Sequence, residues 1–283
     1  MSFVIKMEEK ILFERFLFED DKEITINDIE FFVDRIVMLP KIRPHKLDKA
    51  VSLSVEYCHK SGFHQKIIDN ADICPVLIYR LFKRGVLLFE EIKSQKMCFS
   101  YLLSYYFHRE IEDFDTYIKS KSSPKGFDTS FINNEFDIDQ LIEYGFLPSS
   151  IEYILKYDVI DDLVVFDNLN QKAKWSPFEW SMNPQCFKWS LMPEYLDLLS
   201  FAGFFGSIKC FKHLLMKGFK INENVLSMVV CSGSFDLYHL CQVEHCIIPI
   251  LVCEASKFLH LQLLVFLVEN GYDINSKDKD NKF

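Results

Sequence analysis

A block of sequence that returns at a fixed spacing constrains the fold of this chain more than any other feature. The block spans residues 199–222 and returns in degraded form 53 residues later, with a half-step copy 27 residues after the first. Repetition at one spacing predicts stacked units, because a unit of this size cannot bury its apolar face alone. The matching positions are Leu199 with Val252, Ala202 with Ala255, Leu214 with Leu267, Gly218 with Gly271 and Asn222 with Asn275.

Each unit is expected to form a pair of helices. In the best-preserved copy an apolar first helix covers residues 199–205, and its small Ala202 and Gly203 allow a neighbouring helix to pack closely. After a turn at Gly206, apolar residues at helical spacing predict a second helix. Gly218 is expected to end that helix, because glycine takes the left-handed conformation after a helix C-terminus without steric cost.

The order of these residues resembles the ankyrin repeat, which has alanine in its first helix, a Leu-Leu pair in its second, then glycine and a closing Asp-Val-Asn. The closest match is the stretch 272–278, Tyr-Asp-Ile-Asn-Ser-Lys-Asp. The chain is similar to degenerate ankyrin proteins of large protist families. The resemblance implies an all-α chain, in which a helical N-terminal region precedes an ankyrin-type α-solenoid with short linkers. The residues that carry the resemblance are Ala202, Leu214-Leu215, Gly218 and Ile221-Asn222.

Three regions are expected along the chain. Residues 1–133 form a helical N-terminal region, residues 134–190 hold degenerate ankyrin-like units and a Trp-containing loop, and residues 191–283 hold the ankyrin repeats. The first boundary rests on the stretch from Ser120 to Asn134, where serine, glycine, proline and asparagine interrupt the helical periodicity.

The last repeat looks truncated, because the sequence stops at Phe283, where the next ankyrin helix would open. A repeat array usually closes with a polar capping unit that shields its last apolar face. We therefore expect apolar surface to be exposed around Leu263, Leu264 and Leu267.

The composition favours a helical protein with a continuous core. The chain has 283 residues, of which 49% are hydrophobic and 26% charged, as in ordinary globular proteins. Only 9 Gly and 9 Pro interrupt it, which argues against a sheet protein with frequent turns. The net charge of -9 disfavours nucleic acid as a partner, because a phosphate backbone would be repelled.

Cysteine usage and hydropathy predict a cytoplasmic protein. No apolar window approaches the roughly 18 residues that span a bilayer, so membrane insertion is not expected. The number of cysteines, 9, is odd and their spacing is irregular, which favours reduced thiols over a secreted disulfide scaffold.

A group of histidines and cysteines near residue 240 is the best candidate for a metal site. Zinc accepts mixed imidazole and thiolate ligands, but the spacing here matches no zinc signature. The repeat register places Cys241 where Leu214 stands in the preceding unit, so we expect Cys241 to point into the core. We assign no metal ligand and no cofactor. The group comprises His239, Cys241, His245, Cys246 and Cys253, and a weaker one comprises Cys58, His59 and His64.

The sequence contains no motif that indicates catalysis. A nucleophile elbow, a P-loop, a zinc-protease helix and a dinucleotide turn are all missing. Ser122 and Lys125 match the pattern S-x-x-K, but they lie in the expected linker without the partner motifs. An enzyme would instead need polar residues that converge in a cleft between the N-terminal helices and the stack. We assign no catalytic residue.

Two tryptophans lie on a duplicated, proline-interrupted stretch. Trp180 and Trp189 stand nine residues apart within a tandem echo. Exposed tryptophan is frequent in binding hot spots. The interpretation we favour is that these side chains cover the helical stack.

These observations predict a non-enzymatic scaffold or adaptor that binds a protein partner through stacked repeats, without a small-molecule substrate. The contact residues are not predicted. Two alternatives remain open. The chain is a substrate-recognition subunit that recruits an enzyme such as a ubiquitin ligase, or it is a non-functional fragment of a longer ankyrin protein.

Overall fold

The structure is a computed structural model, and it describes residues 29–42, 47–71, 73–95, 101–121, 132, 135–176, 178–179, 195–241, 250–258 and 260–274. These residues form sixteen helices and one two-stranded sheet. The expected all-α class is therefore confirmed. In this part of the chain, no helix is long and apolar enough to cross a membrane.

The first half of the chain consists of short helices. Helix α5 illustrates why they form: Pro75 occupies its first turn, where a missing N–H costs no hydrogen bond, and the apolar residues 75–78 and Leu81 are buried. The helices are α2 (Ile29–Ile42), α3 (Leu47–Tyr57), α4 (Phe63–Asp69), α5 (Pro75–Lys83), α6 (Phe89–Gln95), α7 (Tyr101–Tyr106), α8 (Phe114–Lys119) and α9 (Glu135–Tyr144).

The second half is a succession of helix pairs, with a small antiparallel sheet before the third helix. In the sheet Ala173 pairs with Leu196, and Lys174 with Tyr195. The elements are α10 (Ile151–Lys156), α11 (Ile160–Val164), β1 (Ala173–Lys174), β2 (Tyr195–Leu196), α12 (Leu198–Phe205), α13 (Ile208–Met216), α14 (Glu223–Ser232), α15 (Phe235–Cys241), α16 (Ile250–Lys257) and α17 (Leu261–Glu269).

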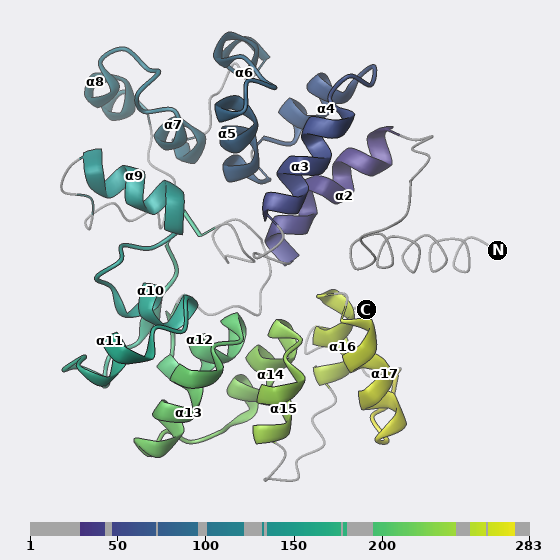
Figure 1. Cartoon of the computed structure of the whole chain (residues 1–283), viewed down its shortest axis with the longest axis vertical. Coiled ribbons are helices and arrows are strands. Elements are labelled where there is room, and N and C mark those ends of the chain that lie inside the picture. Colours follow the sequence, from purple (N-terminus) through teal and green to yellow (C-terminus); the bar gives the residue numbers. More distant parts are fainter. Residues whose placement is uncertain are drawn as a thin grey trace.

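The helix pairs pack in series. Helices α10, α12, α14 and α16 contact one another in that order, and each also contacts the helix that follows it in the chain. The second helices α11 and α13 contact each other as well. Figure 1 shows the helices following one another around an open arc, from α2 through α9 to α17, with α11 and α13 on its outer side.

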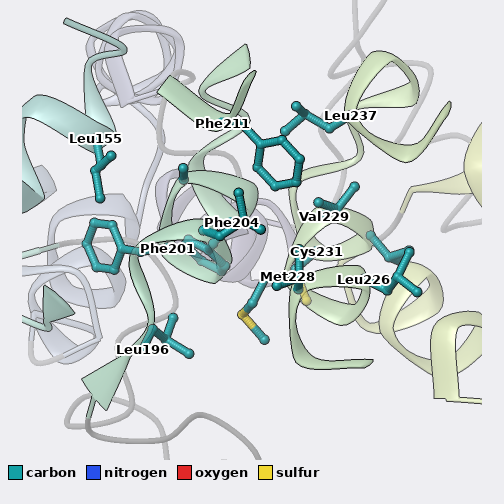
Figure 2. Packing of buried hydrophobic residues seen from close by; sticks show 14 of the residues in the cluster. Leu155, Leu196, Phe201, Phe204, Phe211, Leu226, Met228, Val229, Cys231 and Leu237 are labelled. Carbon is teal, nitrogen blue, oxygen red and sulfur yellow. The ribbon is translucent and has the colours of Figure 1, made fainter. Parts of the chain in front are cut away.

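Two hydrophobic clusters fill the interior. The N-terminal cluster runs from Phe32 to Ile142 and includes the distant Phe178, whereas the C-terminal cluster runs from Phe146 to Leu267. Figure 2 shows the centre of the C-terminal cluster, where Phe204 and Phe211 lie between the chain around Phe201 and that around Val229. The two clusters thus meet in sequence just before Phe146.

Small residues bring α12 and α14 together as expected. A Cβ atom added to Gly203 would lie 3.0 Å from a methyl carbon of Val229, so the contact leaves no room for a larger residue. Gly218 and Gly271 follow α13 and α17 with φ angles of 94° and 90°. The predicted glycine stops are confirmed.

The expected exposure of the last helix is wrong in its details. Leu263 and Leu267 are buried rather than exposed, while Leu261 and Val265 on the same helix are exposed. The reason is that α17 contacts α16, and α15 through Phe266, so that Leu263 and Leu267 lie within the C-terminal cluster. Its remaining face carries the exposed residues.

Candidate functional site

The residues singled out from the sequence do not assemble into a metal site in the described part of the chain. There, no group of three or more His, Cys, Asp or Glu residues is placed to hold a metal ion. His245 and Cys246 lie outside the described residues, as do Ser122, Lys125 and both tryptophans of the duplicated stretch.

Cys241 points into the core, as the repeat register predicted. Its side chain is buried in the C-terminal cluster, and burial raises the pKa of its thiol to about 12. A thiol with this pKa is neutral at physiological pH, so Cys241 behaves as a small apolar residue. Cys58 is half-buried and its Sγ donates to the carbonyl of Val55.

A buried ion pair, which sequence reasoning missed, lies in the described part of the interior. Lys156, at the end of α10, places its Nζ 2.7 Å from Oε2 of Glu179. The two side chains are only 6% and 0% exposed. Lys156 Nζ also donates to the carbonyl oxygen of Tyr144 at 2.8 Å. A buried ammonium is thereby paired and hydrogen-bonded, as burial of a charge requires.

Aromatic rings surround the ammonium group. Lys156 Nζ lies 5.8 Å from the ring centre of Phe146, 5.1 Å from that of Tyr157 and 5.9 Å from that of Phe205. A cation near a ring face is attracted by the ring quadrupole, and the attraction grows when water is excluded. The surroundings of the ammonium thus include the Glu179 carboxylate, the Tyr144 carbonyl and the rings of Phe146, Tyr157 and Phe205.

Burial governs the electrostatics of this pair. It lowers the pKa of the Lys156 ammonium, while the Glu179 carboxylate acts in the opposite direction and offsets part of this lowering. Burial, and to a smaller extent the negative charge of Glu179, also raise the pKa of the Tyr157 hydroxyl. This hydroxyl donates a hydrogen bond to the carbonyl of Tyr144. Perturbed pKa values of this kind occur at catalytic sites and in structural ion pairs alike.

A glycine packs closely against both members of the ion pair. Gly145, with a φ angle of 82°, lies so close that an added Cβ atom would stand 2.6 Å from Glu179 Oε2 and 3.2 Å from Lys156 Nζ. Gly145 is therefore in contact with both charged groups, and a side chain at this position would collide with the pair. The ion pair therefore joins the turn after α9, the end of α10 and the segment at Glu179.

The segment around Glu179 connects the two hydrophobic clusters. Trp175 lies in the C-terminal cluster against Phe201 and Phe204, with ring centres 5.2 and 5.1 Å apart. Three residues later, Phe178 lies in the N-terminal cluster, and its carbonyl accepts a bond from Tyr106 at 3.3 Å. Trp175 and Phe178, only three residues apart, therefore belong to different clusters.

A second polar cluster lies between α7 and α9. Asp139 accepts a hydrogen bond from Arg109 and lies 3.6 Å from Nε2 of the buried His108. Burial, and to a smaller extent the negative charge of Asp139, raise the pKa of the Tyr79 hydroxyl. The arrangement fastens the turn after α7 to α9.

Adjacent helix pairs are joined by polar contacts at helix starts. Asp158, in the turn between α10 and α11, accepts hydrogen bonds from the backbone N–H groups of Lys209 and Cys210 at 3.1 and 2.8 Å. These two N–H groups belong to the first turn of α13. Ser207 stands at the N-cap position of α13 but makes no capping bond, because the Ser207 hydroxyl donates to the carbonyl of Leu155. One unit thus caps a helix of the next.

A similar contact joins α14 to the start of α17. His260 precedes α17, and its Nε2 lies 2.8 Å from the carbonyl oxygen of Cys231. Because a carbonyl only accepts, Nε2 carries the proton. The ring stacks on Phe258 and lies over Gly233, where an added Cβ atom would overlap it.

Comparison of the chain with protein-family models, with curated proteins and with solved structures finds no match.

Proposed function

We propose that the chain is a non-enzymatic scaffold of the cytoplasm, in which a stack of ankyrin-like helix pairs binds a protein partner. The observation that carries the proposal is the serial contact of α10, α12, α14 and α16, each with its own second helix. In a stacked-repeat protein each unit contacts its neighbours, and the elongated surface that results serves for binding.

Contacts between units support the same proposal. The carboxylate of Asp158 caps the helix of the following pair, and His260 bonds to the carbonyl of Cys231 in the preceding one. Each contact fixes one unit against the next. A stack held in this way presents its outer side chains in a constant arrangement, which a protein partner can recognise.

The interior ion pair does not favour an enzyme. Lys156 and Glu179 are bonded to each other, and the rings and Gly145 close around them. A general acid or base must reach a substrate atom within hydrogen-bond distance. A scaffold is therefore the function that this geometry supports best.

Cross-linking of captured partners tests the proposal. The purified full chain is incubated with extract of the native cell, and lysine-reactive cross-links are mapped by mass spectrometry. We expect reproducible partners that cross-link to exposed lysines of the helix-pair region, such as Lys172 and Lys220, more often than to Lys83 and Lys93 in the first half.

Two results would contradict the proposal. One is that a helical, monodisperse sample captures no reproducible partner. The other is that every cross-link falls in the first half of the chain. Subunits of a ubiquitin ligase among the cross-linked partners would favour the substrate-recognition alternative over a simple scaffold.

A further inference from the structure

Helix α11 and the turn after it expose acidic and apolar side chains together. Asp161, Asp162 and Asp167 are exposed, and between them Val164 and Val165 are 57% and 73% exposed. Single exposed apolar residues are common on protein surfaces. Two adjacent exposed valines within an acidic stretch go beyond such single residues and indicate a surface that binds a partner.

The neighbouring helix α13 exposes the opposite charge. Lys209, Lys212 and Met216 follow one another at spacings of three and four, so they lie on one face of the helix. Met216 is 79% exposed, and Lys217 and Lys220 are exposed beyond it. One face of α13 therefore carries Lys209 and Lys212 together with the apolar side chain of Met216.

The charges on these two helices are available to a partner. Among the described residues, the side chains of Asp161, Asp162, Lys212 and Lys217 make no hydrogen bond and no ion pair. The two helices contact each other and lie on the outer side of the arc. An acidic and a basic stripe, each with exposed apolar residues, therefore run side by side.

We propose that α11 and α13 form a self-association surface for a second copy of this chain. A two-fold axis along the seam between the helices places α11 of each copy on α13 of the other. Asp161 and Asp162 then meet Lys209 and Lys212, and the exposed valines meet Met216 of the partner copy. Such a surface is self-complementary, as a two-fold interface must be.

Charge complementarity selects this occupant. A partner with acidic groups alone would satisfy α13 but would be repelled by α11, whereas a second copy satisfies both stripes at once. The paired charges lie at the rim of the contact, so the association is expected to weaken as salt rises. The proposal does not depend on the scaffold function.

Sedimentation equilibrium of charge-reversal variants tests the surface. We expect the wild-type chain to form a dimer with a dissociation constant on the order of ten micromolar at low salt, as small interfaces do. Lys212→Glu and Asp162→Lys should each weaken the dimer about tenfold or more. The double variant should recover most of the loss, because the swapped charges face each other again.

The matched control is Lys93→Glu on α6, an exposed lysine of the first half, which should leave the dimer unchanged. Far-UV circular dichroism and the midpoint of urea unfolding establish that each variant is folded. A wild-type chain that is monomeric at 100-fold the expected constant (on the order of a millimolar) would overturn the proposal. So would a dimer that is insensitive to both reversals, or a double variant that is no better than the single ones.

Discussion

At the scale of single residues, the pair of Lys156 and Glu179 shows how a buried charge is accommodated. Taking both ions out of water is costly, and their attraction offsets that cost only if the remaining polar atoms are also satisfied. Here the carbonyl of Tyr144 and the rings of Phe146 and Tyr157 complete the surroundings. We therefore expect the pair to fix the conformation of the turn after α9 and to contribute little to the free energy of unfolding.

Removal of one member of the Lys156–Glu179 pair should lower the free energy of unfolding more than removal of both. We expect Lys156→Met to lower the free energy of unfolding by about 3–5 kcal/mol, because Glu179 is left as an uncompensated buried charge. The double variant with Glu179→Met should be more stable than this single variant. Urea unfolding followed by circular dichroism measures both, with the exposed Lys217→Met as control. Additive losses would show that the two groups are not coupled.

The buried thiol of Cys241 should make stability sensitive to alkaline pH. Burial raises its folded-state pKa to about 12 from 9.0. The folded chain therefore binds more protons than the unfolded chain above pH 9, and the stability contributed by the neutral thiol is lost as pH rises toward 12. We expect the gap in unfolding free energy between wild type and Cys241→Ala to narrow by up to about 2 kcal/mol between pH 9 and pH 10.5.

The control for this measurement is Leu237→Val, a core truncation on the same helix that removes no titratable group. Its gap from wild type should stay constant over the same pH range. A gap for Cys241→Ala that is equally constant would show that the thiol does not titrate differently in the folded chain.

At the scale of elements, helix α13 depends on the preceding helix pair for its cap, whereas α12 and α14 are capped by their own Asp197 and Asn222. Asp158 takes a positive φ angle of 56°, which an aspartate adopts only in special turns, and so reaches the first turn of α13. Ser207, at the position that would cap this helix locally, bonds elsewhere. The start of α13 is therefore stabilised by the preceding pair.

Two substitutions of Asp158 should distinguish the stability contributed by the cap from the cost of the positive φ angle. We expect Asp158→Gly to cost about 1–2 kcal/mol, because the cap is lost while the positive φ angle is free of strain. Asp158→Ala should cost about 1 kcal/mol more, because alanine pays for the left-handed conformation. Thermal and urea unfolding measure both. A glycine variant as stable as wild type would show that the two hydrogen bonds contribute nothing.

Gly233 and Gly206 offer a matched pair of helix-terminating glycines. Both have φ angles near 70°, but an added Cβ atom meets only Ser232 at 3.9 Å beside Gly206, whereas it overlaps the His260 ring beside Gly233. We expect Gly206→Ala to cost about 1 kcal/mol and Gly233→Ala about 2–4 kcal/mol. Adding His260→Ala to Gly233→Ala should remove most of the excess. If the two glycine variants cost the same, the ring does not constrain α17.

Sequence periodicity predicted the elements better than the contacts between them. The helix pair from residue 199 to Gly218 follows from apolar spacing and glycine stops, which are local signals. The partners of Lys156 and Asp158 are not local: they lie 23 residues away at Glu179 and 52 residues away at Cys210. No sequence spacing encodes such pairs, and neither residue belongs to a recognisable motif.

At the scale of the whole molecule, we expect Trp175, Phe178 and Glu179 to make the two hydrophobic clusters unfold together. Trp175 lies in one cluster and Phe178 in the other, and the buried Glu179 is paired with Lys156. These residues therefore provide one of the connections between the two clusters, beside the hydrogen bonds of Lys156 and Tyr157 to the Tyr144 carbonyl. Cooperative unfolding of the full chain is the expected consequence.

Buried cysteines report on the two clusters separately. Cys74 belongs to the N-terminal cluster and Cys241 to the C-terminal cluster. We expect both to become reactive toward a thiol reagent at the same urea concentration in the wild-type chain, as read by mass spectrometry of pulse-labelled protein. Leu237→Ala, which weakens the C-terminal cluster alone, should shift both midpoints together, because the clusters are coupled.

Phe178→Ala should break this coupling. The substitution removes a fully buried ring from the N-terminal cluster, at a cost of about 3–5 kcal/mol, and loosens the segment that carries Glu179. Cys74 should then react at lower urea than Cys241, so that one transition becomes two. A wild-type chain whose two cysteines already react at different urea concentrations would contradict the coupling, as would a Phe178→Ala chain in which they still react together.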